Sequence, residues 1–189
     1  TRTAKQQDVQ RFGLLYGGLY GTRIEDTEIS FGLNDVYKLH AVYESSDDNP
    51  PKIPYIVLSE ATFFAPGTVI TGGTSGARAI VVSFINSTLR LYNVDLNGSS
   101  FSPGETVTGV DADNNVLTAT IDDADGSVEK GSKVITNQYE LNQAQNPFFY
   151  DVSRLVRKPG TTPPTRQLMA VFDYFIHEAS GDYFSGQSY

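Results

Sequence analysis

The chain has 189 residues, 14 lysines and arginines against 22 aspartates and glutamates, a formal net charge of −8 and no cysteine. The lack of cysteine excludes disulfide frameworks, thiolate metal sites and cysteine nucleophiles. The acidic balance argues against nucleic acid or an anionic membrane surface as a partner, because both need a cationic face, and no apolar run approaches the roughly 20 residues that span a bilayer. We therefore expect no nucleic-acid partner and no membrane span.

The start of the chain is polar and carries no signal-peptide pattern. The first residue is Thr1, and the only methionine is Met169. We expect the chain to be a piece of a longer polypeptide.

Helix patterns are weak in the first third of the sequence. Residues 6–15 suggest about two helical turns, which the glycines from Gly13 onward end. The first predicted strand is 37–43, in which Leu39, Ala41 and Tyr43 alternate with other residues. Gly, Ser, Thr, Asn, Tyr and Phe are common throughout, which is typical of strands and turns.

An internal repeat occupies the middle of the chain. Residues 64–72 read FAPGTVITG, and residues 101–109 read FSPGETVTG, so both fit the pattern F-x-P-G-x-x-[I/V]-T-G. A turn-rich stretch and then an apolar run follow each copy, at 79–84 and at 116–121. Pro-Gly and Asn-Asn are typical of turns, and the β-branched runs between them favour strands. Two copies are too few for a solenoid and favour a small duplicated β-barrel or sandwich.

Composition separates the repeat region from the rest of the chain. Only one of the eleven tyrosines, Tyr92, lies within 61–128, and this region holds two arginines against seven acidic residues. We predict a discontinuous β domain made of 1–60 plus 129–189, with 61–128 inserted as a duplicated β module. Two consecutive domains are the rival arrangement. The predicted fold class is all-β, built from small β-barrel or sandwich modules.

Two further elements are predicted after the repeat region. Residues 141–145 suggest a short helical turn before Pro147. Residues 168–176 are apolar on both faces apart from Asp173, which is typical of a strand in the middle of a sheet.

No catalytic constellation is recognisable. A serine relay needs a hydroxyl, a base and an orienting acid that converge, and the only histidines are His40 and His177. Ser180 and Asp182 lie near His177 in the sequence, but the chain has no G-x-S-x-G elbow. We expect structural or surface roles for both histidines and no catalytic residues.

Two acidic segments and one glycine-rich segment resemble ligand loops. Residues 111–115 and 122–126 share parts of a calcium loop, but Ile121 occupies the first ligand position of the second segment and the first segment lacks the glycine. The segment 72–76, GGTSG, lacks the Lys-Ser/Thr and the helix of a phosphate-binding loop. Hairpin turns explain all three, so we expect no metal and no cofactor.

Aromatic and basic side chains gather near both ends of the chain. The aromatic residues at 16, 20 and 148–150 suit a core, a sugar-stacking platform or a subunit interface. A single basic cluster contains Arg154, Arg157, Lys158 and Arg166. On an acidic chain we expect these cations to pair with carboxylates and not with phosphates.

The C-terminal third has a recognisable sequence pattern. Residues 149–160, 168–175 and 180–185 resemble segments of the very large virion structural proteins of T4-like tailed bacteriophages, especially marine ones. The repeat, with the trailing residues 74–77, is similar to small β modules of phage tail and fibre proteins. The resemblance covers about half of the chain, and it implies a virion component without an enzyme site.

We therefore expect a non-enzymatic virion structural protein of a phage tail, from the baseplate or fibre region, that mediates subunit assembly. Its partners would be other virion proteins, including copies of itself. The alternative is a carbohydrate-binding or host-adhesion module whose partner is a host surface glycan. An enzyme ranks third, because no carboxylate pair of the kind glycosidases need stands out. The expected interface residues are aromatic and lie in glycine-rich or loop-like text: Tyr16, Tyr20, Phe148, Phe149, Tyr183 and Phe184.

Overall fold

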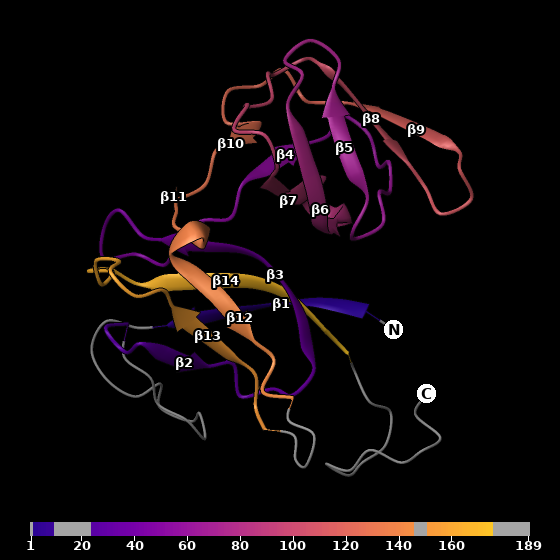
Figure 1. Cartoon of the computed structure of the whole chain (residues 1–189). Helices are drawn as coiled ribbons and strands as arrows, with labels where there is room; N and C mark the ends of the chain where they lie inside the picture. Colours follow the sequence, from indigo (N-terminus) through magenta and orange to yellow (C-terminus); the bar gives the residue numbers. More distant parts are fainter. Residues whose placement is uncertain (1, 10–23, 146–150, 176–189) are drawn as a thin grey trace.

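The computed structural model describes residues 2–9, 24–145 and 151–175. The described residues form an all-β protein with three antiparallel sheets, two short 3-10 turns and no α-helix. The strands of the four-stranded sheet are β1 (Arg2–Val9), β14 (Leu168–Phe175), β3 (Val36–Glu44) and β11 (Lys133–Val134), in that order. The three-stranded sheet contains β12 (Tyr139–Asn142), β13 (Arg154–Arg157) and β2 (Glu28–Ser30). Figure 1 shows these two sheets in one lobe, which we call the lower lobe.

The seven-stranded sheet makes the upper lobe in Figure 1. Its strands, in spatial order, are β10 (Val128–Glu129), β4 (Tyr55–Val57), β7 (Arg90–Asp95), β6 (Arg78–Ile85), β5 (Val69–Gly72), β8 (Thr106–Val110) and β9 (Val116–Thr120).

Strand β14 confirms the prediction of a central strand at 168–176 as far as residue 175. It pairs with β1 on one side and β3 on the other. Both of its faces are buried, because Leu168, Ala170 and Phe172 pack in the core of the lower lobe whereas Met169 and Val171 pack toward the upper lobe. The three-stranded sheet covers the lower core with Ile29 and Leu155, among others.

Strand β3 matches the strand predicted at 37–43, but its alternation is broken. Ala41 pairs with Val171 and Leu39 pairs with Phe172, so the register skips His40. Leu39 consequently packs against the lower core, whereas Ala41 and Tyr43 face the upper lobe. A bulge of this kind re-aims side chains, which a strict two-residue period cannot show.

Both helix predictions are wrong where the structure describes them. Residues 6–9 belong to β1 and pair with 168–171 of β14, while 10–15 lie outside the described residues. Leu141 and Asn142 belong to β12 and pair with Leu155 and Arg154. Cross-strand pairing outweighs the modest helix propensity of these short stretches.

The two copies of the repeat pair with each other about a local twofold axis. Thr71 of β5 lies opposite Thr108 of β8, and these two threonines occupy the same position in the repeat. The flanking pairs, Ile70 with Gly109 and Gly72 with Val107, exchange under the same rotation. The upper core, which contains the equivalent residues Phe64 and Phe101, is therefore built jointly by both copies.

The upper sheet curls but does not close. An isolated bridge between Leu58 and Ile121 brings the end of β9 toward the end of β4. In the part of the chain that the structure describes, this bridge is the only pairing across that gap, and no closed barrel forms. The barrel form of the expected fold is thus wrong, and the all-β class is confirmed.

Two neighbouring chain segments connect the lobes. Tyr55 pairs with Glu129, and the amide of Ser132 donates a hydrogen bond to the carbonyl of Lys52 (2.9 Å). The chain thus enters and leaves the upper sheet at neighbouring points between β3 and β11. The upper sheet includes β4, which precedes residue 61. The division into a discontinuous domain and an insertion stays a prediction.

A third core cluster fills the space between the lobes. Ala41, Tyr43, Met169 and Val171 of the lower lobe pack there with Ile53, Ile80 and Val94. The face of the upper sheet that carries Ile80 is opposite the face that carries Ala79 and Val81 of the upper core. Both faces of β6 are therefore covered.

Candidate functional site

The expected interface aromatics fall in segments without structural description. Tyr16, Tyr20, Phe148, Phe149, Tyr183 and Phe184 all lie outside the described residues, as does His177. The candidate sites described below lie in the two lobes and at their junction.

His40 is held by an acid that the sequence did not mark as its partner. Its Nε2 lies 2.8 Å from Oδ2 of Asp173, which also accepts a hydrogen bond from the hydroxyl of Tyr37 (3.1 Å). Burial raises the pKa of the Asp173 carboxyl, but hydrogen bonds from His40 and Tyr37, together with the nearby charges of His40 and Lys38, outweigh it, so that the pKa lies below its usual value. Asp173 is the one acidic residue in an otherwise apolar strand, and this isolated carboxylate is the sequence signal for a polar partner in the neighbouring strand.

The surroundings of His40 do not complete a catalytic relay. A pocket of about 180 Å³ beside it is lined by Pro66, Gly67, Ile80 and Val82, among others. The described lining contains no serine or threonine, so the His40–Asp173 pair has no hydroxyl nucleophile there other than the phenol of Tyr37. The pair contributes polar contacts at the junction between β3 and β14.

The GGTSG segment is a hairpin turn, as predicted. Its amides also bind the side-chain carboxylate of a residue from the second repeat. The carboxylate of Glu105 accepts hydrogen bonds from the amides of Thr74 (3.1 Å), Ser75 (2.9 Å) and Ser102 (2.7 Å) and from the hydroxyl of Ser75 (2.7 Å). A Cβ on Gly72 would lie 2.7 Å from this carboxylate, so glycine is needed for the close approach. Glu105 of the second repeat thus connects that repeat to the turn of the first by hydrogen bonds.

The acidic loops use their carboxylates locally. Asp111 accepts hydrogen bonds from the amides of Asp113 (2.9 Å) and Asn115 (2.8 Å). Asp122 accepts one from the amide of Ala124 (3.2 Å). Within the described ranges, no group of three or more acidic or histidine side chains could share a metal ion.

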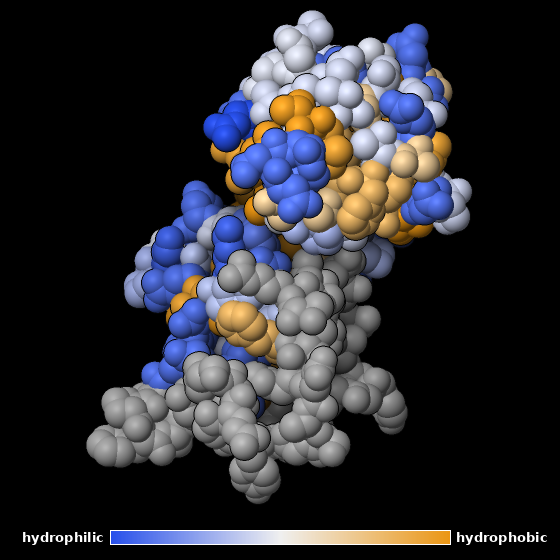
Figure 2. All heavy atoms as spheres, turned by 90° about the vertical axis from the view of Figure 1, so that its right-hand side faces the viewer, coloured by the Kyte–Doolittle hydropathy of each residue, from blue (hydrophilic) through white to orange (hydrophobic). Residues whose placement is uncertain are grey.

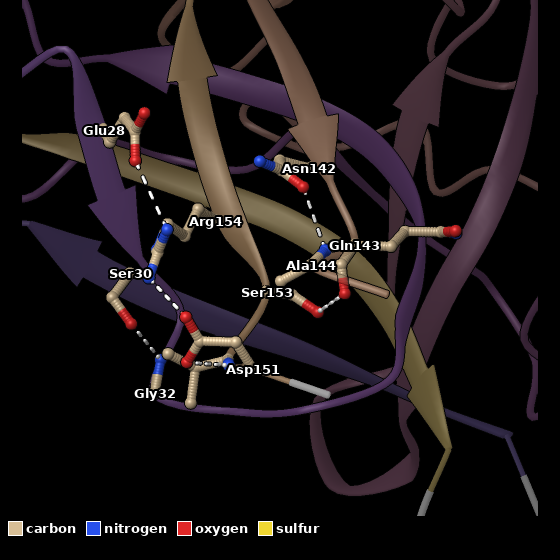
Figure 3. Close-up of polar contacts among 10 residues, drawn as sticks. Glu28, Ser30, Gly32, Asn142, Gln143, Ala144, Asp151, Ser153 and Arg154 are labelled. Carbon is tan, nitrogen blue, oxygen red and sulfur yellow. Dashed lines mark hydrogen bonds and ion pairs between the residues drawn. The ribbon is translucent and has the colours of Figure 1, made fainter. Parts of the chain in front are cut away.

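Two residues of the basic cluster, Arg154 and Arg166, pair with carboxylates as expected, whereas Arg157 and Lys158 donate to backbone carbonyls. Arg154 contacts Asp151 (2.6 Å) and Glu28 (3.6 Å), and Figure 3 shows this arginine between the two acids at one end of the three-stranded sheet. Arg166 pairs with Asp48. Arg157 and Lys158 donate hydrogen bonds to backbone carbonyls. These interactions leave the cluster poorly suited to binding a phosphate.

One face of the upper sheet is exposed and carries only valine and threonine over three strands. We call it the valine–threonine face, and its members are Val69, Thr71, Thr106, Thr108, Val110, Val116, Thr118 and Thr120. Val110 and Val116 are cross-strand partners and are 51% and 68% exposed. Figure 2, which looks onto the β8–β9 side of the upper lobe, shows apolar spheres among hydrophilic ones there.

This face continues a surface that is already an interface. Val69 is the cross-strand partner of Ile80, which packs between the lobes. The valine row thus begins at the buried junction and ends at Val116 on β9, the last strand of the sheet. The two-residue alternation of β8 is the sequence signal for this row, but the pairing of β5, β8 and β9 that aligns the valines is tertiary.

A groove of about 550 Å³ lies at the junction of the lobes. Its walls combine apolar side chains, such as Val82, Ile85 and Met169, with polar ones. Tyr55 and Tyr92 are cross-strand partners whose ring centroids lie 5.7 Å apart.

One cation–π contact and one ion pair lie in the polar part of this groove. The guanidinium of Arg90 lies over the ring of Tyr55, 4.7 Å from its centroid. Lys52 pairs with Glu129 (3.2 Å). Of the residues in this groove, only Tyr92 stood out in the sequence, as the one tyrosine within 61–128, and it was not assigned to a site.

Comparisons of the chain with protein-family models, curated proteins and solved structures found no match. Among the described residues, no helix has the length and apolar character needed to cross a membrane.

Proposed function

We propose that this chain is a non-enzymatic structural protein of a bacteriophage tail, from the baseplate or fibre region, and that its valine–threonine face joins it to a second copy in the virion. The resemblance of the C-terminal third and of the repeat to phage virion proteins supports the setting. The exposed valine row supports assembly. Contiguous exposed apolar side chains bordered by polar ones are typical of interaction sites.

A second copy is the partner that fits this face best. Over β5, β8 and β9 the face carries no charge, and its neighbour on β6, opposite Thr71, is the exposed cation Arg78. The whole chain has a net charge of −8, so two copies can approach there without burying an unpaired carboxylate. Flat β-branched surfaces pack face to face in sandwiches. The same sheet already packs in this way through Ile80 against the lower lobe. A twofold contact is the commonest way for soluble chains to form a closed oligomer.

Replacing Val110 and Val116 together by lysine tests this proposal. We expect the wild-type chain to form dimers and the variant to be monomeric in sedimentation velocity. Each valine that returns to water costs about 1.5 kcal/mol, or roughly tenfold in affinity, and the lysines add repulsion.

The matched control is Val134→Lys. Val134 is also an exposed strand valine, 56% accessible, but it lies on β11 of the lower lobe. We expect this variant to dimerise like the wild type. A wild-type chain that stays monomeric up to millimolar concentration, or equal losses in both variants, would refute the proposed interface.

Carbohydrate binding is the second candidate function, and the groove between the lobes favours it. Tyrosine rings, apolar side chains and unpaired hydroxyls in one cavity suit the apolar faces and hydroxyl edges of sugars. In a phage tail, such a site would bind a glycan of the host surface.

A further inference from the structure

The groove at the junction of the lobes has free polar groups on its walls. In the part of the chain that the structure describes, the hydroxyls of Tyr55, Tyr92 and Ser83 make no hydrogen bond to protein atoms. The same wall offers apolar contact through Val82 and Ile85. Its volume of about 550 Å³ falls within the roughly 300–1,000 Å³ range of small-ligand sites.

Arg90 is the distinctive group of this wall. It is the first residue of β7, lies opposite Ile85 of β6 and holds its guanidinium over the ring of Tyr55, 4.7 Å from the centroid. No carboxylate among the described residues lies within ion-pair distance of it. This contact holds the guanidinium over the ring of Tyr55, and no hydrogen bond to a described residue occupies its N–H groups. A guanidinium held in this way matches a planar carboxylate with two parallel hydrogen bonds.

The charges of the groove also favour an anionic ligand. The only other charged groups on its described lining are Lys52 and Glu129, which pair with each other. The groove therefore carries an excess positive charge on a chain whose net charge is −8. A neutral sugar would leave Arg90 without an ionic partner, whereas an acidic sugar would supply one.

We infer that this groove binds a saccharide that contains a uronic acid unit, with Arg90 as the partner of its carboxylate. The inference rests on the second candidate function, carbohydrate binding, and names the ligand class of that site. The sugar hydroxyls are placed to hydrogen-bond with Tyr55, Tyr92 and Ser83, and Ile85 and Val82 contact its apolar face.

Binding of tetragalacturonate, compared with its fully methyl-esterified form, tests the inference. The ester keeps the sugar rings and removes only the negative charge. In isothermal titration calorimetry on the full chain, we expect the acid to bind at least tenfold more tightly than the ester, since a hydrogen bond to a charged group is worth a tenfold change or more. Arg90→Ala should remove that preference, and Arg90→Lys should restore part of it.

Arg78→Ala is the control, because Arg78 is an exposed arginine of β6 that does not line the groove. We expect it to bind tetragalacturonate like the wild type. Melting curves verify that each variant is folded. Equal binding of acid and ester, unaffected by Arg90→Ala, would overturn the uronate inference and leave carbohydrate binding standing. If neither saccharide binds the wild type, both fail, and the assembly proposal is unaffected.

Discussion

Phe64→Ala is expected to lower the free energy of unfolding of the upper lobe by about 3–5 kcal/mol, the usual cost of removing a buried aromatic ring. Phe64 is fully buried in the upper core, and its ring lies so close to Gly109 that a Cβ there would be 3.1 Å from it. The ring of the first repeat thus packs on the strand of the second. Urea unfolding followed by circular dichroism measures the loss.

The neighbouring residue supplies the control for this prediction. Phe63 is 63% exposed, so Phe63→Ala should change the free energy of unfolding by less than about 0.5 kcal/mol. Phe101→Ala, at the equivalent position of the second repeat, should be nearly as damaging as Phe64→Ala because Phe101 packs in the same core. If Phe101→Ala proves as harmless as Phe63→Ala, the two repeats do not share one core.

Glu105→Gln should produce the second large loss, about 1–3 kcal/mol at neutral pH. The side chain is only 5% exposed, and its carboxylate accepts three backbone amides and one hydroxyl. The amide group of glutamine offers a single acceptor oxygen, so at least one buried donor loses its partner. Glu60→Gln, on an exposed glutamate, is the control and should have little effect.

The same carboxylate predicts a pH dependence. Burial raises the pKa of Glu105, but hydrogen bonds from Ser75, Ser102 and Thr74 lower it more, so the folded-state pKa lies below the ordinary value of 4.5. A group of this kind stabilises the folded state fully above its unfolded-state pKa and loses that contribution as the pH falls through the folded-state value.

Melting temperatures measured across this range check the sign of the effect. The advantage of the wild type over Glu105→Gln should be constant above about pH 5.5 and should shrink as the pH falls through 4.5 and below. An advantage that grows on acidification would contradict the description of Glu105 as a bound anion.

Local patterns in the sequence predicted much of the fold. The duplicated motif correctly placed two hairpins, and the doubly apolar run at 168–175 correctly indicated a central strand. The carboxylate partners of Arg154 and Arg166 followed from the charge balance. In each case the deciding information lies within a few consecutive residues or in the overall composition.

Features that depend on distant residues could not be predicted. The bulge at His40 and its contact with Asp173 arise from the register between β3 and β14. The groove joins Tyr55, Arg90 and Glu129 only because the upper sheet orders its strands as β10, β4 and β7. Strand order and register are set by tertiary pairing, which no single stretch of sequence encodes.

Photo-crosslinking from Val116 tests the central claim, assembly through the valine–threonine face, most directly. A benzoylphenylalanine placed at this position, in the full chain, reacts only with atoms that touch it. We predict a crosslinked dimer whose mapped contact lies on β5, β8 or β9 of the second copy. We predict no dimer from the same probe at Phe63, which is 63% exposed against 68% for Val116. Equal crosslinking from both positions, or none from Val116 at concentrations where the chain sediments as a dimer, would contradict it.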